Sequence, residues 1–190
     1  MKNANDILST YISDMMAFEK GFFEALDRQV KDEKVRTQPQ ASRLIERIHQ
    51  TTKAHLSATE QRLHILGGSL TANVKEAVGT LAGIAAGMID KVRTHAVSKM
   101  LRDDYTALSM AAISYTMLHT TGLALRDQAT ADLALRHLRE ITPLIVELSE
   151  MVPSVVVNEL AGQTTDVNSG VAGEAVRNTH QTWTRESIDR

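Results

Sequence analysis

The chain has 190 residues, 43% of them hydrophobic and 23% charged, and this composition is typical of one soluble globular domain with a full core. Its net charge of -2 offers no positive field for nucleic-acid phosphates, so a nucleic-acid partner is not expected. The absence of cysteine excludes disulfides, thiolate metal ligands and cysteine nucleophiles.

The N-terminal half of the sequence predicts two long amphipathic helices. The chain starts without the apolar core of a signal peptide, so we expect a cytoplasmic protein. The first helix is predicted from Asn5 or Asp6, either of which can cap it, to about Val30. A short charged segment, in which the chain reverses direction, follows this helix. The second helix is predicted from Pro39, a residue that suits a first turn, to the glycine pair at 67–68.

The C-terminal half predicts two more long helices, at about 95–125 and 130–151. The fourth helix contains Pro143, which lacks a backbone N–H, so we expect a bend near Thr142. Short connections within each half and a long one between the halves are typical of ferritin-like folds. The sequence therefore predicts an all-α protein, a ferritin-like four-helix bundle with a long helical crossover between the second and third long helices.

Three regions follow from this pattern: the bundle within residues 1–152, the crossover at 69–94, and a polar C-terminal tail at 153–190. The tail is rich in small and polar residues, so we expect it to be partly flexible or docked on a protein partner. Its lone tryptophan, Trp183, leaves both alternatives open, because an indole without a surrounding core often marks a contact but the tail around it is polar.

The predicted crossover contains Gly79, Gly83 and Gly87, a spacing that lets another helix approach closely. Its apolar run, residues 78–89, is shorter than the roughly 20 residues that a transmembrane helix needs, so no transmembrane segment is expected. We expect the glycines to pack within the bundle or across the interface of a homodimer or higher homo-oligomer. Attachment to a membrane surface is the alternative.

A glutamate stands in the centre of the first helix's apolar face. At a four-three spacing this face reads Leu8, Ile12, Met15, Glu19, Phe22 and Leu26. An unpaired carboxylate buried there would lose several kcal/mol of hydration. Glu19 is therefore expected to be neutralised, hydrogen-bonded, bound to a metal ion or turned out of the core.

The other helices supply four further residues at comparable depth: His55, His119, His137 and Glu140. With Glu19, three of them, His55, His119 and Glu140, are the candidate ligands of a single iron, manganese or zinc ion. Ferritin-like proteins with two metal ions use Glu-x-x-His pairs. The nearest approaches among the candidates are Thr52-x-x-His55 and the reversed His137-x-x-Glu140.

The alternative for these histidines is structural. Each would then be neutral and donate a hydrogen bond to a backbone carbonyl or to a carboxylate such as Glu19. The three tyrosines fall at core spacing and are interpreted as plain core residues. The sequence shows no hydrolase triad.

Three stretches carry a recognisable pattern: Ala17-Phe18-Glu19-Lys20, His55-Leu56-Ser57-Ala58-Thr59-Glu60 with Leu66-Gly67-Gly68, and Ala111-Ala112-Ile113-Ser114-Tyr115-Thr116. They resemble the ferritin-like bacterial YciE/YciF family over most of residues 1–150. The resemblance implies a helical bundle that is often dimeric, is associated with stress responses and, in the family, is suspected of holding a di-metal centre.

The chain departs from this family at the expected ligands. Glu19 matches the family's first-helix glutamate, but Ser57 and Ala58 stand where the pattern has acids, and residues 113–116 replace a Glu-His-Tyr-Glu sequence. Two close divalent ions need several carboxylates. The sequence therefore predicts a non-catalytic, stress-related or scaffolding bundle with a degenerate metal site. The alternative is a metal-binding protein or oxidoreductase with a reduced Glu/His site.

Overall fold

The computed structural model describes residues 3–68 and 96–183, and within these ranges the chain is helical, with no β-strand. The elements in chain order are α1 (Ala4–Lys31), α2 (Glu33–Arg36), α3 (Pro39–Ile65), α5 (Val97–Ala124), α6 (Gln128–Ala161), the 3₁₀ helix η1 (Ser169–Val171) and α7 (Ala172–Trp183). The predicted all-α class is confirmed for the described residues. The predicted crossover at 69–94, with its three glycines, lies outside them.

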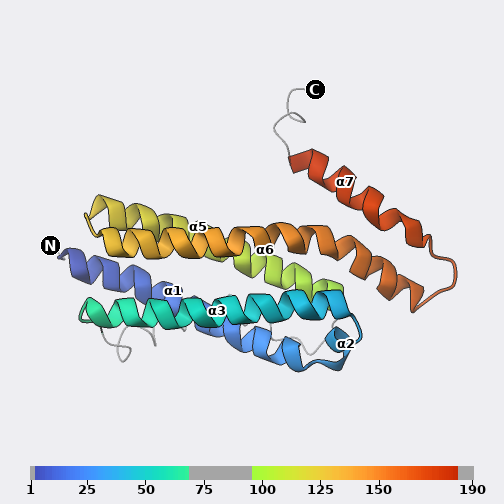
Figure 1. Ribbon diagram of the computed structural model, residues 1–190, viewed down its shortest axis with the longest axis horizontal. Helices are drawn as coiled ribbons and strands as arrows, with labels where there is room; N and C mark the ends of the chain where they lie inside the picture. The colour runs from blue at the N-terminus through green and yellow to red at the C-terminus, as the bar shows by residue number, and fades with distance from the viewer. Residues whose placement is uncertain (1–2, 69–95, 184–190) are drawn as a thin grey trace.

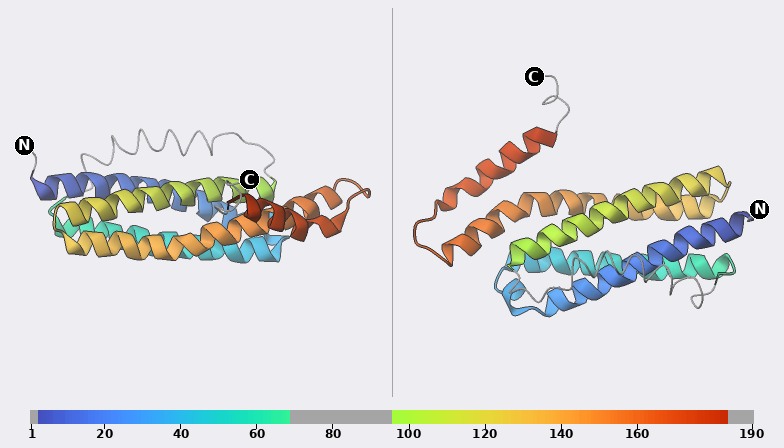
Figure 2. Two further views of the ribbon diagram at one scale, coloured as in Figure 1. Left: turned by 90° about the horizontal axis from the view of Figure 1, so that it is seen from above. Right: turned by 180° about the vertical axis from the view of Figure 1, so that it is seen from behind.

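The described helices α1, α3, α5 and α6 are long and lie side by side (Figure 1). α1 and α3 run antiparallel, with α2 in the turn between them, and α5 and α6 form a second antiparallel pair. The pairs contact each other because α1 also packs on α5 and α3 on α6. α3 and α5 run in the same direction, so the end of α3 and the start of α5 lie at opposite ends of the molecule (Figures 1 and 2).

Local signals account for most helix ends. α1 is capped by Asn3, whose Oδ1 accepts from the backbone N–H of Asp6 at 2.8 Å, and Asp6 accepts from Asn3 in return. The predicted cap at Asn5 or Asp6 is therefore wrong by a few residues. α3 begins at Pro39 as predicted, and it ends just before Gly67, which has a φ of +78°.

The fourth long helix continues beyond its predicted end at Met151. α6 passes through both Pro143 and Pro153 and ends at Ala161. Apolar side chains after Pro153, such as Val155, remain buried, and this burial offsets the backbone hydrogen bond that the proline removes. α6 bends along its length (Figure 1), as expected for a helix with internal prolines.

The tail contains a further helix. α7 contacts α6, although none of its described residues is buried. Trp183 is 62% exposed, and its ring lies 6.0 Å from that of Tyr105 and 6.4 Å from that of His180. The part of the tail that ends at Trp183 thus contains helix and touches its own chain.

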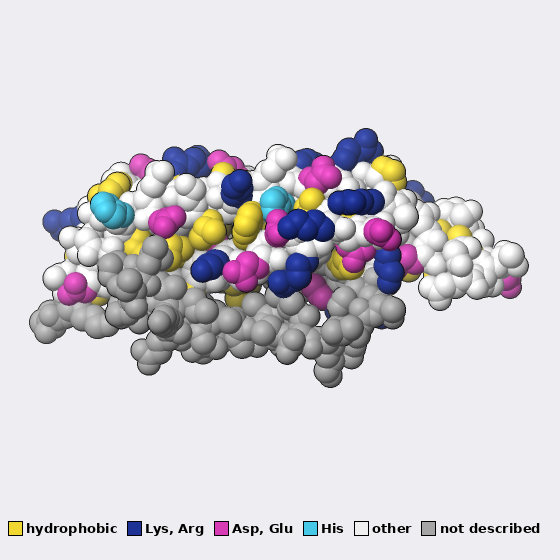
Figure 3. All heavy atoms as spheres, turned by 90° about the horizontal axis from the view of Figure 1, so that it is seen from below, with side chains coloured by type: hydrophobic (Ala, Val, Ile, Leu, Met, Phe, Trp, Pro, Cys, Tyr) yellow, Lys and Arg dark blue, Asp and Glu magenta, His cyan; other side chains and the backbone are white. Residues whose placement is uncertain are grey.

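The surface is mixed in character. Figure 3 shows positive and negative side chains interspersed over the face drawn there, with smaller apolar areas between them. Within the described residues, no helix has both the length and the apolar character needed to cross a membrane.

The core lies between the long helices and is mainly aliphatic. Its largest buried side chains include Leu8, Ile12, Leu26, Leu44, Ile45, Ile48, Leu63, Leu101, Leu108, Leu118 and Leu148. Several buried polar residues interrupt it, and some of them group together in one region between the helices. That group is the candidate site.

Candidate metal centre

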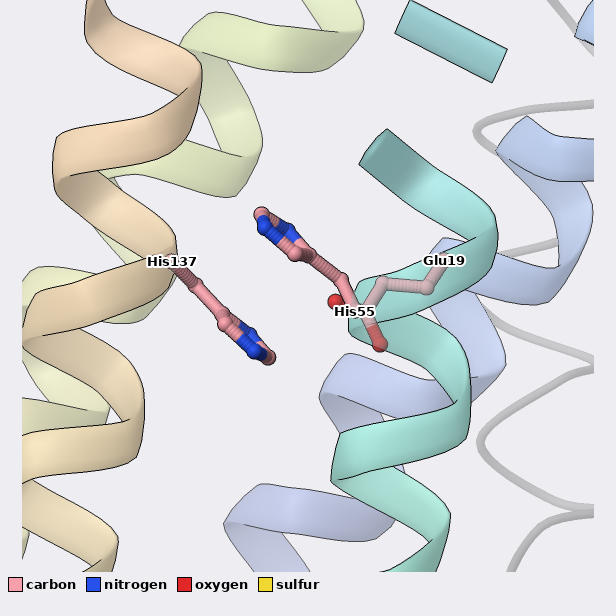
Figure 4. A group of neighbouring side chains, drawn as sticks. All are labelled: Glu19, His55 and His137. Atoms are coloured by element: carbon pink, nitrogen blue, oxygen red, sulfur yellow. The ribbon is translucent and has the colours of Figure 1, made fainter. Parts of the chain in front are cut away.

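Each long helix contributes at least one polar side chain to the same buried region. These side chains are Glu19 from α1, His55 from α3, Tyr115 from α5 and His137 from α6, and each residue is at most 2% exposed. Figure 4 shows Glu19, His55 and His137 extending from their helices into the space between them. We call these four residues the buried cluster.

Helical periodicity places these residues inside. Glu19 lies four residues after Met15 and three before Phe22, both buried, so the apolar face of α1 carries the glutamate into the core. His137 likewise lies between Ala134 and Ile141 on the buried face of α6. The prediction that Glu19 occupies the core is confirmed.

Close polar contacts connect residues of the buried cluster. The Tyr115 hydroxyl donates to Oε1 of Glu19 and lies 3.1 Å from Nδ1 of His55. On the other side of the His55 ring, Nε2 lies 2.6 Å from Oε2 of Glu140, whose side chain is 48% exposed. These contacts link a half-exposed carboxylate to a buried one, but the single Tyr115 proton bonds either to Glu19 or to Nδ1 of His55, not to both.

The pair of Glu140 and His55 defines the tautomer of the imidazole. A carboxylate accepts, so Nε2 of His55 carries the proton, and Nδ1 keeps its lone pair directed toward the interior. A carboxylate behind a histidine is the arrangement that orients metal-bound imidazoles in proteins.

Two polar atoms of the buried cluster have no hydrogen-bond partner among the described residues. They are Oε2 of Glu19 and Nδ1 of His137. A buried polar atom without a partner costs about 1–3 kcal/mol, more when it is charged. The two atoms come from α1 and α6, and the buried hydroxyl of Thr59 on α3, which is also without a hydrogen-bond partner among the described residues, lies close enough to Glu19 to lower its pKa.

The electrostatics of the buried cluster favour neutral imidazoles. Burial, with added repulsion from His55 and Arg136, lowers the pKa of His137 to about 3. Burial also lowers the pKa of His55, against the opposing effect of Glu140. The two rings stack at a centroid distance of 3.8 Å and an angle of 4°, a contact that two imidazolium ions would oppose. A neutral imidazole is the form that binds a metal ion.

The pKa of the Glu19 carboxyl group lies close to neutral pH. Burial raises the pKa of Glu19 to about 7, and interactions with the hydroxyl groups of Tyr115 and Thr59 act in the opposite direction. Burial also raises the pKa of the Tyr115 phenol well above its usual value, with a further contribution from Glu19. A cation placed beside Glu19 would stabilise its ionised form.

The geometry suits one metal ion. One donor atom from each of Glu19, His55 and His137 lies within 4.8 Å of the other two, within the part of the chain that the structure describes. Donors around a tetrahedral ion are about 3.4 Å apart when each bond is about 2.1 Å. Because the rings of His55 and His137 stack in nearly parallel planes, at least one ring would have to turn for both to bind the same ion.

The structure brings together most of the residues predicted from the sequence. Glu19 and His55 lie in the buried cluster, and Glu140 contacts it through His55. His119 lies elsewhere, because its Nδ1 is 2.8 Å from the carbonyl oxygen of Ala131, near the turn between α5 and α6. This contact with a backbone carbonyl is the structural role that the sequence offered as the alternative for its histidines.

Sequence reasoning gave too little weight to His137 and Tyr115. His137 lies three residues after Ala134 and four before Ile141, which puts it near the apolar face of the predicted fourth helix, but this spacing does not by itself separate it from Glu140. Nothing in the sequence separates Tyr115 from the other tyrosines.

The chain also contains one intact Glu-x-x-His sequence, Glu46-x-x-His49, and it faces away from the buried cluster. Glu46 is exposed and accepts from Ser42, and His49 lies 3.6 Å from Asp27. The motif therefore plays no part in the candidate site.

A second buried carboxyl group lies outside the cluster. Asp104 on α5 is 1% exposed, and its Oδ1 accepts from Nε2 of Gln29 on α1 at 2.8 Å. Oδ2 of Asp104 and Oε1 of Gln29 both lack a hydrogen-bond partner among the described residues. Burial raises the pKa of Asp104 to about 7, so the group holds its proton far more firmly than a free aspartate.

Comparison of the chain with protein-family models, curated proteins and solved structures found no match. The resemblance to the YciE/YciF family stays a prediction.

Proposed function

We propose that this protein is a ferritin-like four-helix bundle that holds one divalent transition-metal ion between Glu19, His55 and His137. One observation carries the proposal: these three buried side chains converge, and two of their polar atoms lack a partner among the described residues. Native proteins rarely leave buried polar atoms unsatisfied, so a ligand is the simplest explanation.

The distribution of these side chains over the four long helices supports a ferritin-like arrangement. Ferritin-like di-metal sites take a glutamate from each of two helices and a Glu-x-x-His pair from each of the other two. Here α1 provides Glu19 and α5 provides Tyr115. α3 and α6 each keep the histidine of the pair, and the glutamate three residues earlier is replaced by Thr52 and by Ala134.

The remaining donors suit one ion and not two. Two divalent ions carry four positive charges, and Glu19 is the single carboxylate of the buried cluster. Burying that much uncompensated charge is strongly unfavourable, so we propose no di-iron oxidase or ferroxidase chemistry. One carboxylate and two neutral imidazoles are a usual donor set for zinc, iron or manganese.

The protein residues define what the site can do. Glu19 supplies the charge that compensates the cation, while His55 and His137 supply neutral nitrogen donors. A bound ion would supply Lewis acidity. We assign no reaction to the site. A stress-related or scaffolding role and a homodimeric state remain proposals that follow from the family resemblance.

Metal analysis of the purified protein tests the proposal. After incubation with zinc, iron(II) or manganese(II) and gel filtration, we expect about one ion per chain in the wild type. Glu19→Gln removes the charge with little change of shape, and His137→Ala removes a nitrogen donor, so both should lose the ion. His119→Ala is the matched control, because it removes a histidine outside the buried cluster. Wild-type protein that retains no ion, or equal loss in His119→Ala and His137→Ala, would overturn the proposal.

A second candidate function is a bundle without metal, whose core polar residues serve stability alone. It is favoured by the pKa of Glu19 near 7. A protonated Glu19 can donate to Tyr115, Tyr115 to His55, and His55 to Glu140, so that three of the groups satisfy one another without an ion. The same metal analysis separates the two functions.

A further inference from the structure

A surface groove lies between α3 and α6. It has a volume of about 520 Å³, and its wall is formed by Arg47, Gln50, Thr51, Ala54, Arg139, Glu140, Pro143 and Leu144. The side chains of Ala54 and Pro143 are small for helix surface positions, which helps to leave the space open. The groove is wide enough to admit hydrated ions and small molecules.

Glu140 connects this groove to the buried cluster. The four cluster residues are at most 2% exposed, whereas the Glu140 side chain is 48% exposed and bonded to His55 at 2.6 Å. Among the described residues, Glu140 is therefore the half-exposed group in hydrogen-bond contact with the cluster.

The charges around the groove compensate one another. Arg47 is held by both carboxylate oxygens of Glu147, at 2.8 and 2.7 Å. The remaining wall charges are those of Arg139 and Glu140, which are opposite in sign. The wall residues of the groove thus carry no excess of positive charge, although Arg136 adds positive charge near His55 and His137, and the carboxylate of the wall that contacts the cluster is Glu140.

We infer that the groove between α3 and α6 is the entrance through which a divalent metal ion reaches the buried cluster, and that Glu140 in its wall holds His55 in the tautomer that binds the ion. The inference rests on the proposed function, because it assigns an entrance and a positioning residue to the same site. Glu140 accepts from Nε2 of His55 and so keeps the Nδ1 lone pair directed inward.

Blocking the groove tests the entrance. Ala54→Trp fills the groove with a bulky ring, and Lys53→Trp places the same ring on the preceding residue of α3, an exposed position outside the groove wall. Gln50→Trp offers a second plug if the first variant folds poorly. Binding of cobalt(II) alone is followed by stopped-flow absorption. We expect the plugs to slow association and dissociation by the same factor, several-fold or more, and to leave Kd unchanged, while Lys53→Trp behaves as wild type.

Replacing Glu140 tests its positioning role. Nitrogen NMR of the metal-free protein should show His55 protonated at Nε2, and Glu140→Ala should shift it to a mixture of tautomers. Cobalt affinity should fall by about 10–100-fold, as for other carboxylates behind ligating histidines. Glu140→Gln, which can still accept from Nε2, should restore much of the affinity. Glu147→Ala, which removes a glutamate of the same helix that pairs with Arg47, is the matched control.

The outcomes separate the two proposals. Wild-type rates in both plugged variants, or an unchanged His55 tautomer in Glu140→Ala, would overturn the inference and leave the metal site standing. A wild-type protein that binds no cobalt, zinc, iron or manganese would overturn both.

Discussion

Three buried titratable groups give this protein an unusual core at the residue scale. Glu19 and Asp104 each have a pKa of about 7, whereas His137 has a pKa of about 3. Burial is the main cause in all three cases, because a low-dielectric interior disfavours the charged form. The folded state is therefore more stable when Glu19 and Asp104 are protonated and when His137 is neutral.

Asp104 offers the cleanest test, because it lies outside the buried cluster. A proton on its Oδ2 would give Oε1 of Gln29 the donor that it lacks among the described residues, so one proton satisfies two atoms. The folded-state pKa lies above the ordinary value of 3.8, so this contribution to stability is complete below about pH 4. It is lost progressively as the pH rises to about 7.

We predict that Asp104→Asn stabilises the protein at pH 8 and has little effect near pH 4. The asparagine is neutral and can still bond to Gln29, so the gain at pH 8 should reach up to about 4 kcal/mol in the free energy of unfolding. Urea unfolding at both pH values measures it, with the exposed Asp132→Asn as control. An equal effect of Asp104→Asn at the two pH values would contradict the prediction.

At the element scale, α5 and α6 approach each other closely near the turn that joins them. A Cβ atom on Gly122 would lie 2.7 Å from the backbone nitrogen of Ala131 and 3.0 Å from its Cα. His119, one turn before Gly122, also contacts the Ala131 carbonyl. The absence of a side chain at Gly122 thus sets the distance between the two helices that carry Tyr115 and His137.

We predict that Gly122→Ala destabilises the protein although alanine is the better helix former. The clash involves backbone atoms and requires the helices to separate, so the net loss should be about 1–3 kcal/mol in the free energy of unfolding. Gly162→Ala is the matched control, because its nearest neighbour would lie at 3.5 Å. Urea unfolding followed by circular dichroism measures both variants. Equal stability of the two would show that the helices adjust without cost.

At the scale of the whole molecule, the long helices and the tail differ in how they are held. The buried core draws its side chains from α1, α2, α3, α5 and α6, whereas α7 contributes no buried residue to the described structure. α7 is held through contacts with α6 and through ring contacts of Trp183 with Tyr105 and His180. Elements with little buried apolar surface open at low free energy.

We predict that α7 detaches before the core unfolds. Trp183 is the single tryptophan, so its fluorescence reports on this contact directly. In a urea titration, the fluorescence change should occur at a lower midpoint than the loss of helical circular dichroism. Trp183→Phe should leave the dichroism transition unchanged. Coincident transitions in the wild type would show instead that α7 unfolds together with the core.

The sequence alone determined the helices and the burial of Glu19. Periodicity, proline at a first turn and glycine beyond a helix end are local signals, and they placed α1, α3 and α5 within a few residues of their observed ends. They failed at the end of α6, where the burial of Val155 and Val157 carries the helix past Pro153. That burial depends on neighbouring helices and leaves no local signal.

Only the tertiary structure decided which polar residues meet. His137 and Glu140 are three residues apart on one side of α6, so the sequence could not say which of them faces the interior. The rotation of α6 against its neighbours places His137 in the buried cluster and Glu140 at the groove. This rotation is set by the packing of the whole core, and for the same reason His119 bonds to the Ala131 carbonyl instead of joining Glu19.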